Sequence, residues 1–184
     1  EHEMEEIVKG NTKLARTQFL NLLVKGQIPD KESIENRLDQ LNIQFPHRIF
    51  ISATLVLDNW ERLNYIKNQW EIQNIRDKIE EYIQTTAERE QIYITVLPSD
   101  LNRIVLILNT DIQGDINSPI YWAKKLQTLI KENLEITVSI GMGEPVNSLE
   151  KIFMSYHQSL KALEYKVVYG KNQIIYINDI NRGK

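Results

Sequence analysis

The order in which apolar patterns follow one another is the feature of this sequence that most constrains its fold. Five runs rich in β-branched residues predict strands at residues 48–58, 91–97, 103–109, 135–141 and 172–177. Apolar residues at helical spacing fill every interval between these runs except one, PSDLN at 98–102, which is short enough for a hairpin loop. The predicted order is therefore β-α-α-β-β-α-β-α-β.

This order predicts an α+β fold with the split βαβ core of the ferredoxin-like arrangement, an antiparallel sheet that carries its helices on one face. After the first strand the apolar stripe changes phase near Trp70, which indicates two helical pieces separated by a kink or a short loop. We expect Trp60 and Trp70 to lie in the core. Gly170 is expected to end the last long helix.

Two short helices are predicted ahead of the first strand, at residues 11–25 and at residues 30–41, with Asp30 as the N-cap of the second. Helices of this length are marginal unless an apolar stripe is buried. The apolar stripes of these two helices can pack against one of two surfaces: the body of the same domain, or the same segment of a second copy of the chain. In the second case the contact residues of a homodimer would be Leu14, Phe19, Leu22 and Leu23. We interpret residues 1–45 as a helical connector and residues 46–184 as the main domain.

Composition excludes several function classes. A net charge of −3 provides no overall attraction to nucleic acid or to an anionic membrane. The sequence has no cysteine, which excludes disulfides and thiolate chemistry, and His2, His47 and His157 are too scattered to indicate a metal site. The longest apolar run, residues 49–57, is far shorter than the roughly 20 residues of a membrane span. The acidic start, EHEMEE, lacks the apolar core of a signal peptide, and both ends are interpreted as cuts through a longer protein.

The stretch VSIGMGEPVNSLEKI (138–152) places two glycines between a strand and a helix, where free backbone N–H groups can bind phosphate. A lone Gly-x-Gly is weak evidence for such a site. We therefore interpret Gly141 and Gly143 as structural, with a positive φ angle as the expected reason. Asn147 and Glu150 are expected to form a capping box at the start of the helix.

Three motifs resemble, in the right order, those of the GGDEF superfamily, which has the diguanylate cyclase fold. SIGMG (139–143) is similar to the end of a family strand, and ALEYKVVYGKN (162–172) is similar to the end of the family's last long helix. DNWERLN (58–64) is similar to the family motif D-x-F-K-x-x-N, with Trp60 in place of Phe. The similarity covers about residues 48–180 and implies the same fold.

Over nearly its whole length the chain more closely resembles a degenerate GGDEF-like regulatory domain found in the middle of AraC-type transcriptional regulators of Gram-positive bacteria. Residues 15–43 are similar to the connecting helices of those proteins, and residues 143–180 are similar to the C-terminal half of their regulatory domain. This resemblance implies a sensor or receiver upstream and a helix-turn-helix domain downstream, both outside this sequence.

The resemblance also identifies the positions at which cyclase chemistry would occur. In the active family, carboxylates hold two metal ions so that a 3′-hydroxyl can attack an α-phosphate. The first of these carboxylates falls at Val56, and only the second acidic residue of the same motif is retained, as Asp58. The Asp-Glu pair of the signature hairpin falls at Asn102 and Arg103. Among base-reading positions, Asn64 alone is retained.

The resemblance thus implies no catalytic residue, no metal and no cofactor, with Asp58 and Asn64 as vestiges of a nucleotide site. From its position alone, Asp58 is also expected to cap the following helix. The expected function is a non-catalytic signal-relay and dimerisation domain in the cytoplasm, in a parent protein that is soluble or membrane-anchored. DNA would be contacted only through a domain that is absent from this sequence. This segment is expected to make no contact with a membrane.

Two other function classes are weighed against this expectation. A nucleotide-binding or diguanylate-cyclase-like enzyme domain is disfavoured by the missing carboxylates. An RNA-recognition fold shares the β-α-β-β-α-β order, but it requires aromatic side chains on its central strands and a basic face. The run RIVLILN (103–109) is aliphatic, and the chain is acidic.

Overall fold

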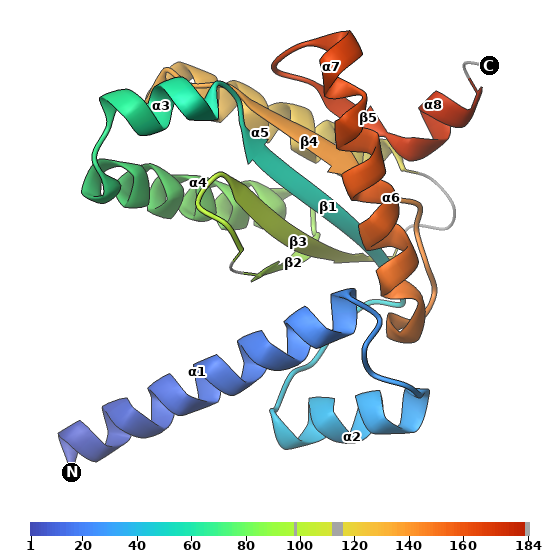
Figure 1. Ribbon diagram of the computed structural model, residues 1–184. Coiled ribbons are helices and arrows are strands. Elements are labelled where there is room, and N and C mark those ends of the chain that lie inside the picture. Colours follow the sequence, from blue (N-terminus) through green and yellow to red (C-terminus); the bar gives the residue numbers. More distant parts are fainter. Residues whose placement is uncertain (98, 112–115, 183–184) are drawn as a thin grey trace.

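The computed structural model describes residues 1–97, 99–111 and 116–182, which form a five-stranded sheet with helices on both faces (Figure 1). The strands are β1 (Ile49–Leu57), β2 (Tyr93–Leu97), β3 (Arg103–Thr110), β4 (Val138–Met142) and β5 (Ile174–Tyr176). The helices are α1 (His2–Val24), α2 (Lys31–Gln40), α3 (Trp60–Ile66), α4 (Gln69–Arg89), α5 (Asn117–Leu134), the 3₁₀ turn η1 (Leu149–Lys151), α6 (Ile152–Glu164), α7 (Lys166–Tyr169) and α8 (Ile177–Arg182). The predicted α+β class and the two N-terminal helices are confirmed. Pro98, in the predicted hairpin loop, lies outside the described residues.

The sheet has the strand order β2-β3-β1-β4-β5, and β1 pairs antiparallel with both β3 and β4. This is the split βαβ topology that the order of patterns predicted. The prediction of a wholly antiparallel sheet was wrong, because β5 pairs parallel to β4. Helix α6 connects these two strands, and a helical crossover returns the chain in the same direction.

Helices cover both faces of the sheet, not one face as predicted. Side chains at odd positions of β1, such as Ile51 and Leu55, belong to the main core with α4 and α5. Phe50, on the other face, joins a second core that includes residues of α1, α2 and α6. The uninterrupted apolar run of β1 indicates two buried faces, because a strand with one solvated face alternates between polar and apolar residues.

Small side chains let α6 approach the second face of the sheet closely. Ser52 N donates a hydrogen bond of 2.9 Å to Ser155 Oγ, and the hydroxyl oxygens of Thr54 and Ser159 lie 2.9 Å apart. These contacts join β1 to two successive turns of α6.

Gly141 and Gly143 of the VSIGMG segment complete this contact. A Cβ atom added to Gly143 would lie 2.0 Å from the carbonyl oxygen of Ser155, and one added to Gly141 would lie 2.2 Å from that of Ser159. The expected positive φ angle was wrong, since neither glycine has one. The glycines are required by the helix backbone that lies against them, which accounts for the motif without a phosphate. The expected capping box of Asn147 and Glu150 also does not form, because Ser148 occupies the N-cap position and makes no side-chain capping bond.

Helix α1 begins at His2, nine residues earlier than predicted from residues 11–25. Its C-terminal part packs on the sheet through Phe19, Leu20, Leu23 and Val24. Residues 1–11 are exposed, and Figure 1 shows this half of α1 extending away from the rest of the chain. Helix α2 is capped as predicted, with Asp30 Oδ1 accepting a hydrogen bond of 2.7 Å from Ser33 N.

The four residues expected at a homodimer contact divide into two groups. Phe19 and Leu23 are buried within their own chain and are unavailable to a second copy, whereas Leu14 and Leu22 are exposed. The reason is the docking of α1 on the second face of the sheet, which takes up one side of its apolar surface. Dimerisation itself and the domain boundary at residues 45 and 46 stay predictions.

The predicted break between two helical pieces lies at Lys67 and Asn68. A capping box between Asn68 and Glu71 begins α4 at this point. The cap fixes the phase of α4, so that Ile72 faces the core and Trp70, about half a turn away, is 75% exposed. The expected core position of Trp70 was therefore wrong, while Trp60 packs against the core as a half-buried residue.

We predict that Gly143→Ala and Gly141→Ala each lower the free energy of unfolding by about 2 kcal/mol or more. The added methyl group must push α6 away from the sheet, and overpacking of this kind costs about 1–3 kcal/mol. Urea denaturation measures the effect. Gly10→Ala is the matched control, because an added Cβ there meets nothing within 4 Å. Equal stability of all three variants would contradict the close-packing account.

Candidate functional site

The positions that the resemblance assigns to metal binding do meet in space. The register of β1 and β3 places Val56 directly opposite Arg103. Leu57 N donates a hydrogen bond of 3.0 Å to the carbonyl oxygen of Asn102. The structure thus brings the positions that the resemblance aligned to one edge of the sheet, with no carboxylate at any of them.

A cleft of about 640 Å³ opens at this edge. It is lined by the end of β1, the start of α3, the β2–β3 hairpin and the α6–α7 junction. Its charged residues are three cations and two anions: Arg62, Arg103, Lys166, Glu61 and Glu164. Among the described residues, no three His, Cys, Asp or Glu side chains are grouped to hold a metal ion. The charge of the cleft does not suit divalent cations.

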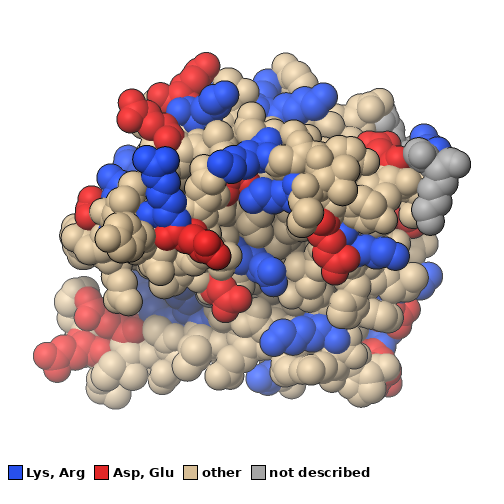
Figure 2. All heavy atoms as spheres, turned by 45° about the horizontal axis from the view of Figure 1, so that its top comes forward, with Lys and Arg blue, Asp and Glu red and all other residues tan. Residues whose placement is uncertain are grey.

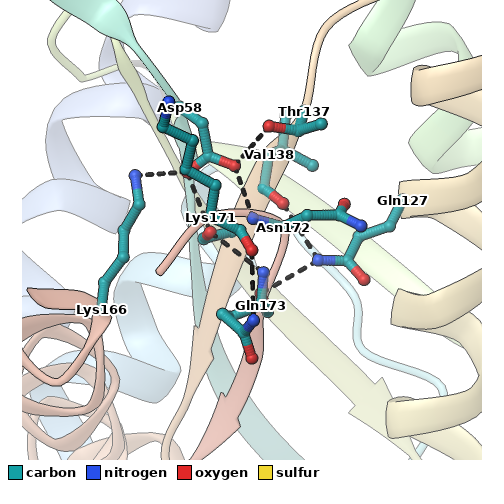
Figure 3. A network of polar contacts seen from close by, with 9 residues as sticks. Asp58, Gln127, Thr137, Val138, Lys166, Lys171, Asn172 and Gln173 are labelled. Carbon is teal, nitrogen blue, oxygen red and sulfur yellow. Dashed lines mark hydrogen bonds and ion pairs between the residues drawn. The ribbon is translucent and has the colours of Figure 1, made fainter. Parts of the chain in front are cut away.

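Asp58 is buried beside this cleft and joins three segments of the chain (Figure 3). Its Oδ2 accepts hydrogen bonds from Thr137 Oγ1 at 2.7 Å and from Asn172 N at 2.8 Å. Its Oδ1 accepts one from Ser139 Oγ at 2.9 Å and forms an ion pair with Lys166 Nζ. The carboxylate thus ties the end of β1 to β4, to α7 and to the residue pair that precedes β5.

The four partners decide the protonation state of Asp58. Burial alone would raise the pKa of this carboxyl, but Lys166, Thr137, Asn172 and Ser139 together lower it below the ordinary value of 3.8. Asp58 is therefore an anion at neutral pH, with each of its oxygens hydrogen-bonded.

The helix-capping role expected for Asp58 was wrong, and the assignment of Asp58 and Asn64 as vestiges of a nucleotide site stays a prediction. Asp58 does not cap α3, because Asn59 holds the N-cap position in a left-handed conformation with φ of 53° and without a side-chain bond. The Asp58 carboxylate points instead toward Thr137 and Lys166 (Figure 3). Asn64 is exposed on α3 and does not line the cleft. The structure does not bring these two residues together.

Gln127 of α5 extends the Asp58 network and was not identified from the sequence. Its Nε2 donates hydrogen bonds of 3.0 Å to the carbonyl oxygens of Val138 and Gln173 (Figure 3). Gln173 N in turn donates to Ser139 Oγ at 3.1 Å. The available signal was a glutamine at a buried position of the apolar face of α5. A buried amide of this kind must be hydrogen-bonded, and here it holds β4 and β5 in place.

Arg76 of α4 was also missed, and it holds the hairpin that carries the family signature. Only 6% of Arg76 is exposed, and its Nη1 donates hydrogen bonds to the carbonyl oxygens of Asp100, Leu101 and Arg103 at 2.6, 2.8 and 3.2 Å. Burial lowers the pKa of this guanidinium, and nearby Glu80 partly offsets the effect. The signal was an arginine within the apolar stripe of α4.

We predict that Asp58→Asn lowers the free energy of unfolding by about 2–4 kcal/mol at pH 7, because Lys166 loses its partner and an amide NH₂ group faces hydrogen-bond donors. Because folding lowers the pKa of Asp58, its contribution is present above the ordinary value of 3.8 and is lost as the pH falls through that value toward the lower folded-state pKa. Urea titrations between pH 7 and pH 3 should therefore show the gap to the wild type narrowing below about pH 4.

The control for this experiment is Asp39→Asn, the same chemical change at an exposed position. Its effect should stay within about 0.5 kcal/mol. A gap between wild type and Asp58→Asn that is constant over the whole pH range would show that Asp58 does not titrate as this geometry requires.

We predict that Arg76→Met costs about 2–3 kcal/mol of stability, because three carbonyl groups of the hairpin lose a charged donor whose own side chain is buried. Hydrogen exchange should quicken at the amide of Arg103, whose bond to the carbonyl oxygen of Asp100 lies inside the clamped hairpin. Arg62→Met, the same change at an exposed arginine that lines the cleft, is the matched control. Unchanged exchange in the hairpin would remove the clamping role.

Comparison with known proteins identifies a family for this chain. Residues 25–165, more than half of the chain, match the family described as GGDEF-like domain. The uncharacterized HTH-type transcriptional regulator YtdP of Bacillus subtilis (strain 168) is 22% identical over 189 residues. That alignment includes 99% of this chain but only 23% of the relative, so the chain corresponds to a minor part of its length.

Solved structures with the same fold include cyclase domains. The active GGEEF domain of a diguanylate cyclase from Vibrio cholerae has a TM-score of 0.59 at 13% identity, covering 78% of this chain and 88% of that one. An EAL/GGDEF domain protein from M. capsulatus has a TM-score of 0.56 at 16% identity, covering 81% and 99%. At these identities the likeness shows the fold alone. With the family match over residues 25–165, it leads to one conclusion: the chain belongs to the GGDEF-like domain family.

Proposed function

We propose that this GGDEF-like domain is a non-catalytic regulatory module that relays a signal within an AraC-type transcriptional regulator. The observation that carries the proposal is the pairing of Val56 with Arg103 at the cleft. Where the resemblance implies metal-binding carboxylates, one strand presents a methyl-bearing side chain and the other presents a guanidinium. Two Mg²⁺ ions require oxygen ligands, and a neighbouring guanidinium repels them.

The residues of the β2–β3 hairpin and the hydrogen bonds that hold it support the same proposal. The resemblance places the family's two hairpin glycines, which let a nucleotide approach the backbone, at Asp100 and Leu101 of this chain. Both positions therefore carry side chains, and their carbonyl groups accept hydrogen bonds from Arg76. The hairpin therefore serves the stability of the domain rather than substrate binding.

The regulatory part of the proposal is supported by the relative, whose printed name is an HTH-type transcriptional regulator. The chain corresponds to 23% of that protein, which leaves ample length for a sensor and a DNA-binding domain. Direct DNA binding by this domain is disfavoured by its net charge of −3. On the face that carries α3 and α7, positive and negative side chains are interspersed (Figure 2). DNA affinity requires clustered cations, so we assign it to a domain outside this chain.

The packing offers a route for the relay. Helix α1 packs against α6 as well as the sheet. Helix α6 leads directly into α7, where Lys166 is paired with Asp58. A shift of α1 would therefore move α6 and reach the C-terminal segment that follows the Asp58 network. We place this relay in the cytoplasm, as expected for DNA regulation. Among the described helices, none has the length and apolarity needed to cross a bilayer.

We predict no diguanylate cyclase activity. Incubation of the chain with GTP and Mg²⁺ or Mn²⁺ should yield no cyclic dinucleotide above a protein-free blank, because no carboxylate is placed to hold the metals. An active GGEEF domain treated identically is the positive control. Product above the blank would refute the proposal and favour the alternative, a nucleotide-binding or cyclase-like enzyme domain.

A metal-binding variant sharpens this test. Val56→Asp combined with Arg103→Glu places two carboxylates at facing register positions. We expect this double variant to bind Mn²⁺ in an electron paramagnetic resonance titration, and the wild type not to do so under the same conditions. Equal Mn²⁺ binding by both proteins would show that the missing carboxylates are not what prevents metal binding.

A further inference from the structure

Arg103 enters the cleft from the face of the sheet that α6 covers. Side chains of β3 alternate between the two faces, with Ile104 in the main core and Val105 in the second core. Arg103 therefore lies on the same face as Val105. Two apolar side chains of α6 line the cleft together with this arginine, Leu160 and Leu163. The guanidinium thus shares the cleft with apolar helix side chains.

The Arg103 side chain carries a donor that nothing in the chain satisfies. Its carbonyl oxygen accepts hydrogen bonds from Arg76 Nη1 at 3.2 Å and from Ser99 Oγ at 2.6 Å, so the backbone of the residue is well bonded. The side-chain Nε is buried, and in the described part of the chain it has no hydrogen-bond partner. A buried donor without an acceptor is destabilising, and a charged donor more so. An acceptor that enters the cleft would remove this cost.

The charges around the cleft limit how much negative charge a ligand can carry. Lys166 is already in an ion pair. The other charged residues of the lining are two arginines and two glutamates, Arg62, Arg103, Glu61 and Glu164. A monoanion can be attracted by one guanidinium, but a polyphosphate would bring several negative charges close to the two glutamates. Positive and negative side chains are interspersed around this end of the sheet (Figure 2). The cleft therefore suits a carboxylate better than a nucleoside triphosphate.

The rest of the lining provides a surface for an apolar ligand body. Its apolar residues come from the end of β1, the start of α3 and the last turns of α6: Val56, Leu57, Trp60, Leu160 and Leu163. Trp60 is half-buried and packs against the main core, which holds its ring in place. The volume of about 640 Å³ is in the range of small-molecule sites. An apolar body can therefore be buried here while its charged end meets the guanidinium.

We infer that the cleft is a metal-independent binding site for a small organic monocarboxylate. The carboxylate accepts hydrogen bonds from Arg103, and the apolar body of the ligand packs against Trp60 and α6. The Nε and one terminal nitrogen of a guanidinium form a fork that matches the two oxygens of a carboxylate, which a lysine cannot reproduce. Binding is independent of the function proposed above, whereas a role of the ligand as the signal of the relay rests on that function.

Benzoate is a suitable probe, because it combines one carboxylate with a planar apolar body. Added without metal to the ¹⁵N-labelled chain, it should shift the nuclear magnetic resonance signals of the Arg103 Nε–H group and the Trp60 indole N–H group in a saturable way. The chain has three tryptophans, and the other two are internal controls. Trp122 is buried in the main core and Trp70 does not line the cleft, so their indole signals should stay in place.

Matched probes test the chemistry of the ligand. Benzamide, the uncharged counterpart of benzoate, should bind at least about tenfold more weakly, because it loses a charge-assisted hydrogen bond. Phenyl phosphate, a dianion at neutral pH, should also bind more weakly than benzoate. The carboxylate site would be overturned by equal binding of benzamide or by tighter binding of phenyl phosphate. It would equally be overturned if neither benzoate nor its aliphatic counterpart hexanoate shifted the Arg103 and Trp60 signals.

Arg103→Lys tests the fork while it keeps the positive charge. The hydrogen bonds of the hairpin use main-chain atoms of Arg103, so the variant should fold, and an unchanged Trp122 signal verifies this. Benzoate affinity should fall at least about tenfold. Arg89→Lys, the same change at an exposed arginine outside the cleft, should bind as the wild type does. Equal affinity of Arg103→Lys and the wild type would refute the inference.

The outcome is separable from that of the cyclase assay. A chain that makes no cyclic dinucleotide and does not bind benzoate lacks this site but keeps the proposed function. A chain that binds benzoate and also converts GTP keeps this site and loses the proposed function.

Discussion

A single buried carboxylate holds together the edge of the sheet where β1, β4 and the C-terminal segment meet. The Asp58 side chain is buried and would be strongly destabilising without partners, yet four donors from three segments surround it. Without this carboxylate, the donors of all three segments would lose their acceptor. The position of α7 and the start of β5 therefore depend on one ionised side chain at the end of β1.

On the function proposed above, the same site is a case in which a fold outlasts its chemistry. The fold is similar to that of a diguanylate cyclase domain, with a TM-score of 0.59. The cleft, however, presents arginines and a lysine, and the hairpin is held by Arg76 from behind. Packing in this fold relies on apolar faces and close helix contacts that are independent of the metal positions. Substitution at the metal positions can therefore proceed without loss of the fold.

The sequence predicted most strands and helices because their apolar patterns are long and regular, and β1 is the clearest example. It did not predict the second layer of helices, since a fully apolar strand does not specify what covers its second face. Val56 and Arg103, which the resemblance aligned from separate stretches of sequence, do face each other across β1 and β3.

Contacts that join distant segments were missed or misassigned. Arg76 is local to α4 in sequence, but its acceptors lie more than 20 residues away. Asp58 was assigned to the adjacent helix, whereas its partners are more than 75 residues distant. Trp70 was misplaced because the capping box of α4, not the hydrophobicity of the residue, determines which way it points. Such long-range polar contacts leave only a weak trace in sequence, a polar residue within an apolar stripe.

The close contact between α6 and the sheet determines how this domain can deform. Gly141 and Gly143 bring the sheet against the backbone carbonyls of Ser155 and Ser159, so at these two positions backbone packs directly against backbone. Interiors packed in this way have low compressibility. When α6 is displaced, β4 must therefore move with it as one rigid body. Bending is confined to the segments on either side, such as the turn at Gly170, which has a φ of 91°.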